Sequence, residues 1–267
     1  MERKVSIITG ASSGIGKALA FKYAKEGYAV ALAARSKAKL DELVEEIKRL
    51  GGVAIAIQCD VAIENDCINL INETVANFQR IDVLVNNAGI SMRSVFAETS
   101  MRVMEQLMQV NFMGCVYCTR HALEHIIKNK GSVIGISSIA GYRGLPGRTG
   151  YSASKFALRG FLQSLRLENK KYHIHVMEAS PGYTQSNIRR EALISDGSKQ
   201  GETPIDENKV MSAEKVAEII FKSMLKRKDE VILTTQGKLV VWLSRRVPKF
   251  VDYLIYKNVS KEPGSPF

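Results

Sequence analysis

Two side chains four positions apart indicate proton-transfer chemistry. Tyr151 and Lys155 lie in a segment of helical character, so they share one face of the predicted helix. A free tyrosine titrates near pH ~10 and exchanges protons poorly at neutral pH. We expect the Lys155 ammonium to stabilise the phenolate and to lower the pKa of Tyr151 toward the working pH. Because such pairs are also common on helix surfaces, their role depends on the residues around them.

A glycine-rich turn near the N-terminus has the features of a phosphate cradle. It follows the apolar run 5–9 and leads into a segment of helical character. A strand, a turn and a helix start direct backbone N–H groups and the positive helix end at one point, and glycine lets a pyrophosphate approach the backbone. The spacing is G-x-x-x-G-x-G, not the commoner G-x-G-x-x-G, and glycine turns also serve helix packing. The residues expected to bind the pyrophosphate are Gly10, Ser12, Ser13, Gly14, Ile15 and Gly16.

The end of the second predicted strand indicates which dinucleotide fits. An NAD-specific site usually presents an acidic residue to the ribose 2′-hydroxyl about 20 residues beyond the glycines. Here Arg35 and Ser36 follow the strand, and no acidic residue occurs before Asp41. An arginine fork binds a 2′-phosphate, which a carboxylate would repel. The sequence therefore predicts NADP(H) as the cofactor, with Arg35 as the discriminating residue; a solvated charge at the strand end is the alternative.

Alternating strands and helices must position these groups. Short runs rich in Val and Ile alternate with segments that carry apolar residues at helical spacing, which is typical of a parallel sheet with helices on both faces. The strand-like runs are 5–9, 29–33, 53–58, 82–85, 132–137 and 173–179, with a seventh at 231–234 after a helix near 212–225. The predicted fold is α/β, a doubly wound Rossmann sheet of about seven strands. It forms a single NAD(P)-binding domain over residues 1–267, in which the polar stretch 187–210 is a substrate flap or an irregular surface loop.

Taken together, the motifs resemble those of the short-chain dehydrogenase/reductase family, nearest in pattern to the branch of the 11β-hydroxysteroid dehydrogenases. The resemblance covers nearly the whole chain, and the motifs occur in the family's order and spacing. They are Thr9-Gly10-x3-Gly14-x-Gly16, Cys59-Asp60-Val61, Asn86-Asn87-Ala88-Gly89, Asn111, Ser138, Tyr151-x3-Lys155 and Pro181-Gly182.

This resemblance implies catalytic roles for four residues. Tyr151 would be the general acid that protonates a carbonyl oxygen as hydride arrives at its carbon, and the base in the reverse direction. Ser138 would hydrogen-bond the same oxygen. Side chains alternate along a strand, so the adjacent Ser137 points to the other side and only one of the two serines can serve. Asn111 would hold a water that connects Lys155 to solvent, and Lys155 would also bind the nicotinamide ribose.

Further cofactor contacts follow from the same resemblance. Asp60 and Val61 would contact the adenine ring, and the run Asn87, Ala88, Gly89 would line the cofactor past the fourth strand. After Pro181 and Gly182 the family usually has a threonine that faces the nicotinamide carboxamide. At that position this chain has Ser186, and Thr184 is a second candidate.

Composition limits the class of protein and its compartment. The 267 residues are 45% hydrophobic, which excludes disorder, and four cysteines do not make a disulfide scaffold. The apolar run after the basic N-terminus is too short for a signal peptide, so we expect a cytoplasmic protein. Cys115 and Cys118 form a C-x-x-C beside His121 and His125, which permits a metal or redox site. Packing residues on a helix are the favoured interpretation, and no metal is predicted.

The C-terminal stretch 236–260 is predicted to be a basic amphipathic helical extension. Nine basic and three acidic residues lie between Lys222 and Lys257, in a chain of net charge +11. The apolar positions are Val240, Leu243, Val247, Phe250 and Leu254, with Trp242 and Tyr253 nearby and Pro248 expected to kink or split the helix. Residues 238–257 fit a peripheral contact with an anionic membrane surface, or packing on the cleft or on a sister subunit. No module for nucleic acid is present.

The predicted function is an NADP(H)-dependent oxidoreductase that interconverts a ketone or aldehyde and an alcohol. A lipophilic small-molecule substrate is expected, because the sequence offers no obvious carboxylate clamp. The alternatives are 3-oxoacyl reduction on an acyl carrier protein, whose acidic surface would suit the basic charge, and a non-catalytic NADP(H)-binding sensor or scaffold. The resemblance also implies a homodimer or homotetramer formed through the helices near 101–128 and 151–169.

Overall fold

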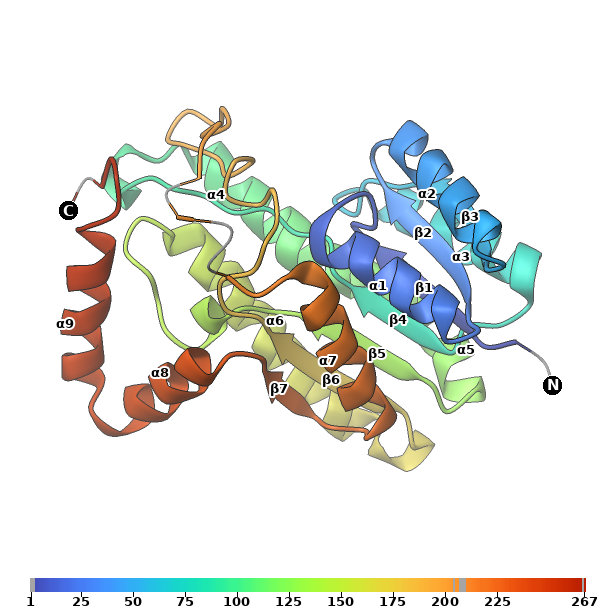
Figure 1. Ribbon diagram of the computed structural model, residues 1–267. Helices are drawn as coiled ribbons and strands as arrows, with labels where there is room; N and C mark the ends of the chain where they lie inside the picture. Colours follow the sequence, from blue (N-terminus) through green and yellow to red (C-terminus); the bar gives the residue numbers. More distant parts are fainter. Residues whose placement is uncertain (1–2, 204, 207–209, 266) are drawn as a thin grey trace.

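A seven-stranded parallel sheet forms the centre of the computed structural model, which describes residues 3–203, 205–206, 210–265 and 267. The strands lie in the order β3-β2-β1-β4-β5-β6-β7 (Figure 1). Their bounds are β1 Val5–Thr9, β2 Ala29–Ala34, β3 Val53–Gln58, β4 Val83–Asn86, β5 Ser132–Ile136, β6 His175–Ser180 and β7 Glu230–Ile232. The order reverses between β1 and β4, and ligands of such sheets bind in the crevice that this reversal opens at the carboxyl ends.

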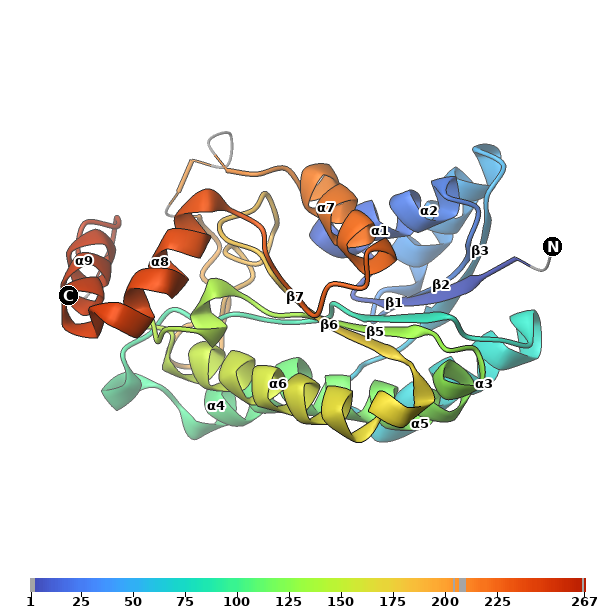
Figure 2. The same ribbon diagram turned by 90° about the horizontal axis from the view of Figure 1, so that it is seen from below.

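Helices cover both faces of this sheet, as the sequence predicted. The helices are α1 Gly14–Lys25, α2 Lys37–Arg49, α3 Glu64–Phe78, α4 Met101–Met108, α5 Gly114–Lys128, α6 Thr149–Glu168, α7 Ala213–Leu225, α8 Thr235–Arg246 and α9 Pro248–Val259. Figure 2 shows α1, α2 and α7 on one face and α3, α4, α5 and α6 on the other. Successive strand residues serve opposite cores, because Ile8 packs with α1, α2 and α7 whereas Ile7 packs with α3, α5 and α6.

Most strand predictions agree with the structure within one or two residues. The clearest difference is β6, which begins at His175 rather than 173 because His173 has a left-handed backbone (φ 57°) that ends a short 3-10 turn. The predicted helical stretch 101–128 contains a π-turn over Gln109–Met113, between α4 and α5. A π-turn adds a residue to the helical turn and locally re-aims side chains.

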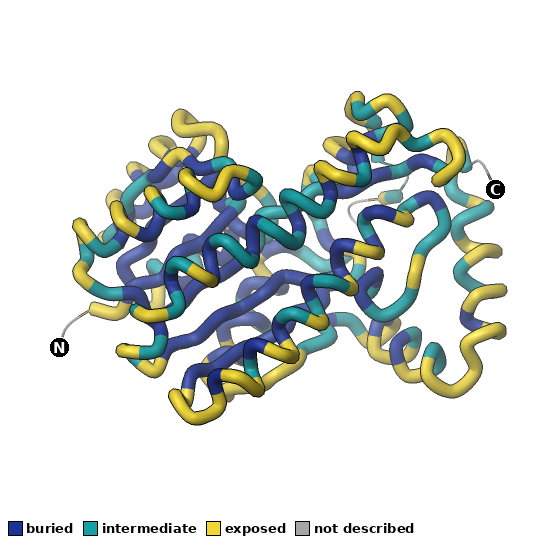
Figure 3. Tube along the Cα trace, turned by 180° about the vertical axis from the view of Figure 1, so that it is seen from behind, coloured by how far each residue is buried: buried dark blue, intermediate teal, exposed yellow. Residues whose placement is uncertain are grey.

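The C-terminal extension is split into α8 and α9, as the position of Pro248 predicted. Pro248 is the first residue of α9, and Val247 before it has non-helical backbone angles. Both helices project from the end of the molecule remote from β3, and Figure 3 shows many exposed positions along them. No helix within the described ranges is long and apolar enough to cross a bilayer.

The stretch 187–210 is irregular where the structure describes it; residues 204 and 207–209 of the predicted flap lie outside the described residues. Leu193 attaches this stretch to the segment after β4. Its N–H donates to the Ser91 carbonyl at 2.9 Å, and its carbonyl accepts from the Arg93 N–H at 2.8 Å. The side chain of Leu193 is buried beside Met92.

Candidate active site

Helix α6 brings Tyr151 and Lys155 to the face that packs on the sheet. Lys155 is 4% exposed, and its ammonium donates to the carbonyl of Ile136 at the end of β5 over 2.8 Å. The Lys155 nitrogen lies 5.7 Å from the centre of the Tyr151 ring. Tyr151 packs against an apolar cluster of Met92, Val103, Leu107 and Leu193, with Ile90 and Met104 at its edge. The two residues therefore share one helix face, on which Lys155 is buried and Tyr151 is half-buried.

The protonation of this pair differs from the expectation based on sequence. Burial raises the pKa of Tyr151 above its usual value near 10, opposed by its hydrogen bond with Ser138 and by the charges of Arg148 and Arg189. Burial also lowers the pKa of Lys155 to about 8, opposed by the negative charge of Glu178. The prediction that Lys155 depresses the pKa of Tyr151 is wrong for the protein alone, because desolvation of the phenolate outweighs the nearby positive charges.

Ser138 lies where the sequence placed it, directly beyond the end of β5. It caps the short 3-10 turn Ile139–Gly141, and its hydroxyl oxygen accepts from the N–H of Ala140 at 3.2 Å. Its hydrogen bond with Tyr151 sets it beside the phenol. The neighbouring Ser137 is buried on the Glu178 side, so the two serines point in different directions as predicted.

Asn111 lies in the π-turn, and its side chain makes three hydrogen bonds within the described residues. Its oxygen accepts from the N–H of Ile90 at 2.8 Å, and its amide donates to the Ile90 carbonyl and to the Ser154 hydroxyl, each at 2.9 Å. These contacts make Asn111 a brace between the segment after β4 and α6. Its oxygen has a second lone pair, so the role of holding a water for Lys155 stays a prediction.

The turn after β1 has the shape that a pyrophosphate requires. Gly10 (φ 65°) and Gly14 (φ 53°) have left-handed backbones, and a Cβ on Gly16 would lie 2.2 Å from the carbonyl oxygen of Gly10. Ser13 occupies the N-cap of α1 without a side-chain bond to the helix, so the first amides of α1 have no side-chain acceptor within the described residues. The cradle thus fits a dinucleotide pyrophosphate, and Ser12 and Ile15 flank these positions.

Thr9 is a site residue that the motif analysis left without a role. Its hydroxyl accepts from the N–H groups of Asn87 and Ala88, each at 3.0 Å, and donates to the Val85 carbonyl. The Asn87 amide donates in return to the carbonyls of Thr9 and Gly10. The turns after β1 and β4 are therefore bonded together. The hydroxyl residue at the end of the first strand is the signal that could have indicated this.

The adenine end of the predicted site lies at the ends of β2 and β3. Arg35 follows β2 and is exposed, and its guanidinium bonds to none of the residues that the structure describes; its carbonyl accepts from Gln58. Asp60 caps the turn after β3 by accepting from the Ala62 N–H at 3.0 Å. Val61 is buried against Gly114, where a Cβ would approach it to 2.7 Å.

Two hydroxyl candidates follow Pro181 and Gly182. Thr184 is buried, and its hydroxyl donates to the Gly182 carbonyl at 3.2 Å. Ser186 lies over the glycine turn, because its Cβ is 3.3 Å from the position that a Cβ on Gly14 would take. Gly89 lies beside Asn111 and Lys155, since a Cβ there would come within 3.2 Å of the Asn111 side-chain oxygen and 3.6 Å of the Lys155 nitrogen.

The four cysteines are packing residues of the core. Cys115 and Cys118 of α5 are buried, and the sulfur of Cys118 lies 3.5 Å from that of Cys67 on α3. Burial raises the pKa of Cys115 to about 12, so its thiol stays protonated at neutral pH. The packing interpretation of the C-x-x-C is confirmed by these contacts.

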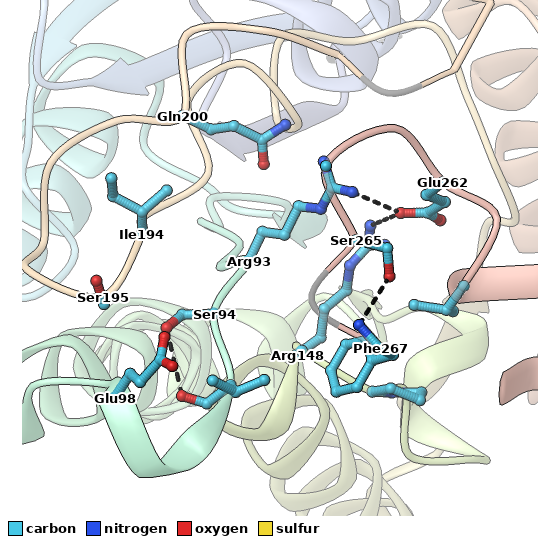
Figure 4. Close-up of a pocket in the computed structure, with 15 residues that line it drawn as sticks. Arg93, Ser94, Glu98, Arg148, Ile194, Ser195, Gln200, Glu262, Ser265 and Phe267 are labelled. Carbon is cyan, nitrogen blue, oxygen red and sulfur yellow. Dashed lines mark hydrogen bonds and ion pairs between the residues drawn. The ribbon is translucent and has the colours of Figure 1, made fainter.

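A cavity of about 270 Å³ lies at the start of α6, near Tyr151 (Figure 4). Its lining does not include Tyr151, Ser138 or Lys155, but it does include Arg148, three residues before Tyr151 on the same helix. Arg93 and Glu262 meet Arg148 there. No local sequence pattern indicates this cluster, because its members are far apart along the chain.

The sheet, the glycine cradle and the Tyr–Lys pair define a Rossmann-type dinucleotide oxidoreductase. Residues 4–196 match the sequence profile described as short chain dehydrogenase. The chain belongs to this short-chain dehydrogenase family, whose members are oxidoreductases that act on CH–OH groups.

Individual relatives cover most of the chain. An "11-beta-hydroxysteroid dehydrogenase A" of Arachis hypogaea is 35% identical over 98% of this chain and 77% of its own length. "Dehydrogenase/reductase SDR family member 7B" of Bos taurus is 34% identical, over 98% of this chain and 83% of its own. The resemblance to the short-chain family and to its 11β-hydroxysteroid branch is thereby confirmed.

Solved structures agree with the fold. An alcohol dehydrogenase of Thermococcus sibiricus, complexed with 5-hydroxy-NADP, is 28% identical and superimposes with a TM-score of 0.77, covering 87% of this chain and 96% of that one. A Burkholderia phymatum short-chain enzyme in complex with NAD has a TM-score of 0.83 over 93% of this chain and 95% of its own; at 20% identity it shows the fold alone.

Proposed function

We propose that this chain is an NADP(H)-dependent oxidoreductase that interconverts a ketone or aldehyde and an alcohol. The observation that carries the proposal is the pairing of a half-buried Tyr151 with a buried Lys155, with Ser138 hydrogen-bonded to the phenol and the glycine cradle across the same crevice. The nicotinamide supplies the hydride when it is bound. The chain supplies the proton and the geometry.

In reduction, the Tyr151 hydroxyl would donate its proton to the carbonyl oxygen as that oxygen gains negative charge. The Ser138 hydroxyl would donate a hydrogen bond to the same oxygen, which stabilises the developing alkoxide. The Lys155 ammonium would lower the energy of the phenolate that remains. In oxidation the same groups act in reverse, and Tyr151 is the base.

Purified protein tests this directly. A Tyr151→Phe variant is expected to bind NADPH as the native protein does and to lose turnover, because it retains the ring and lacks the proton. A non-catalytic sensor or scaffold would show the same nucleotide binding in both proteins and no reduction of any carbonyl compound. Turnover by the variant at the native rate would contradict the proposed role of Tyr151.

Arg35 supports the choice of NADP(H). Its exposed guanidinium stands at the end of β2 with no described partner, available for a 2′-phosphate. A fluorescence titration with NADPH and NADH should show tighter binding of NADPH, and Arg35→Ala should remove most of that preference. Arg49→Ala, which removes the same charge at the far end of α2, is the matched control. Equal affinity of the native protein for both nucleotides would contradict the assignment.

The substrate is proposed to be lipophilic, because Tyr151 faces the apolar cluster around Met92 and Leu193. Reduction of a 3-oxoacyl group on an acyl carrier protein is the second candidate, favoured by the charge of +11. Free lipophilic ketones and 3-oxoacyl carrier protein, compared at equal concentration, separate the two. The compound with the larger kcat/KM identifies the class.

The exposed face of α8 and α9 supports contact with an anionic lipid surface. Six large apolar side chains are 42–57% exposed there: Leu239, Trp242, Val247, Phe250, Tyr253 and Tyr256. Exposed basic residues lie among them, with Arg246 over the Trp242 ring and Lys257 over the Tyr253 ring. The predicted stripe is only partly right, since Val240, Leu243 and Leu254 are half-buried.

Flotation with phosphatidylserine vesicles tests the lipid contact. The native chain is expected to float with these vesicles and not with phosphatidylcholine vesicles. A Phe250→Ser, Lys249→Ser double variant should lose flotation. Equal flotation of both proteins would exclude this face as the contact.

A further inference from the structure

The cavity near Tyr151 is formed where distant parts of the chain meet. The segment after β4 contributes Arg93, the start of α6 contributes Arg148, and the C-terminal segment contributes Glu262 (Figure 4). The irregular stretch after β6 supplies Ile194, Ser195 and Gln200. Charged and polar side chains therefore line a space large enough for part of a small molecule.

Two guanidinium groups in this cavity converge on one carboxylate. The Nη2 atoms of Arg93 and Arg148 each lie 3.6 Å from Oε2 of Glu262, and the three side chains are only 12–17% exposed. The Glu262 oxygen is buried and accepts no hydrogen bond from the residues that the structure describes. Glu262 is thus held by charge alone, at distances longer than those of a hydrogen-bonded arginine–carboxylate pair.

Arg148 has unused binding capacity. An arginine offers five N–H donors, yet no described residue accepts a hydrogen bond from this side chain. Arg93 donates to the Pro263 carbonyl at 2.7 Å. Arg148 is also the N-cap of α6, where the helix end adds positive potential. Two arginines and a helix end face a single, loosely held carboxylate, so the cavity can accept a more tightly bound anion.

The cavity lies near Tyr151, because the charge of Arg148 in its lining acts on the Tyr151 phenol. Arg148 lies about one helical turn before Tyr151, Arg93 directly follows Met92, and Ile194 directly follows Leu193. Met92 and Leu193 both belong to the apolar cluster that contacts Tyr151. This proximity makes the two arginines candidates to bind the far end of a molecule whose carbonyl lies at Tyr151.

We propose that Arg93 and Arg148 bind a carboxylate carried by the carbonyl substrate, and that Glu262 occupies their site until the substrate displaces it. The inference rests on the proposed function and deepens it: the substrate is amphipathic, with an apolar body and an anionic end. It differs from the sequence-based expectation, which rested on the lack of an obvious carboxylate clamp in the sequence. Glu262, itself a carboxylate, shows which chemistry the pair accepts.

Matched ligands test the clamp. Straight-chain oxo-carboxylates with the ketone at increasing distance from the carboxylate, each paired with its methyl ester, are titrated into the NADPH complex, and the nucleotide fluorescence is followed. The best carboxylate should bind about tenfold or more tightly than its ester, since a charge-assisted pair is worth roughly that factor. Arg93→Gln and Arg148→Gln should each reduce the preference. Glu262→Gln should increase it, because the competing carboxylate is gone.

Controls separate this effect from folding and from the proposed function. Arg102→Gln removes the same charge from the exposed surface of the neighbouring α4, and should leave the preference unchanged. Unaltered NADPH affinity in each variant establishes that it is folded. An ester that binds native protein as tightly as its acid overturns the clamp, and so does a preference unchanged in all three cavity variants. Carboxylate binding without turnover supports the clamp and counts against the proposed function alone.

Discussion

The carboxylate of Glu178 lies 3.7 Å from the guanidinium of Arg159, one helical turn beyond Lys155 on α6. Glu178 is 1% exposed in the middle of β6, and its carboxylate also accepts from the Ser180 hydroxyl at 3.2 Å. Burial raises the pKa of Glu178, and the charge of Arg159 opposes that shift. A buried carboxylate at this depth is costly unless it is paired, and here it also acts on the ammonium of Lys155.

Glu178→Gln should therefore shift the pH dependence of turnover. The negative charge of Glu178 favours protonated Lys155, whose pKa is about 8. Its removal lowers that pKa, so the basic limb of the pH profile of kcat/KM should move to lower pH. Glu230→Gln removes the other carboxylate that pairs with Arg159, at 3.4 Å, and should leave the limb in place. If the basic limb of the pH profile does not move in Glu178→Gln, the effect of Glu178 on the pKa of Lys155 is contradicted. Glu178→Asp keeps the negative charge and should show the native pH profile.

Lys155→Met should stabilise the protein while abolishing turnover. The pKa of Lys155 falls from 10.5 in the unfolded chain to about 8 on folding, so between these values the native state binds fewer protons and stability rises with pH. Below pH ~8 Lys155 is charged in both states, so the full unfavourable free energy of burying its charge lowers the stability of the native protein. We expect the variant to exceed native stability by about 1–3 kcal/mol at pH ~7, with a margin that narrows toward pH ~10.

Urea unfolding followed by circular dichroism at several pH values measures this margin. Lys39→Met, an exposed lysine on α2, is the control and should show no dependence of its margin on pH. A constant margin for Lys155→Met would mean that the pKa of Lys155 is the same in the folded and the unfolded protein, which would contradict its lowering by burial.

Gly16→Ala should abolish nucleotide binding, because the added Cβ would lie 2.2 Å from the Gly10 carbonyl oxygen and 2.6 Å from the Asn87 amide. The turns after β1 and β4 would have to separate. Gly160→Ala, at an open and exposed position of α6, should instead stabilise the fold by about 0.5–1 kcal/mol through helix propensity. NADPH titration and thermal unfolding of both variants provide the comparison; native affinity in Gly16→Ala would disprove the cradle.

The predicted oligomer depends on the outer face of α6. Phe156 and Leu167 are 46% and 74% exposed there, although both are large and apolar. Phe156→Glu should convert a dimer or tetramer to monomers, as measured by light scattering after gel filtration. Leu225→Glu, equally apolar and exposed at the end of α7, should keep the native mass. A native protein that is monomeric at micromolar concentration would refute the predicted assembly.

Local sequence patterns were sufficient to predict the strands and the glycine turn after β1. Continuous apolar runs mark buried parallel strands, and the glycines at 10, 14 and 16 report a steric requirement of the backbone itself. The π-turn at Asn111 could not be read from periodicity, because its effect is a single extra residue in one turn. The relation of Arg93, Arg148 and Glu262 was also out of reach, since only the tertiary fold brings them to one cavity. The pKa of Tyr151 depends on burial, which a helix pattern does not measure.

Trp242, the single tryptophan of the chain, lies 55% exposed on α8, away from the sheet. Its emission therefore reports the surroundings of one peripheral helix and is a poor monitor of the central sheet. Unfolding of the sheet should therefore be monitored by other optical signals. A change in indole emission should be assigned first to a change at α8. The chain thus carries a built-in spectroscopic label at its C-terminal extension.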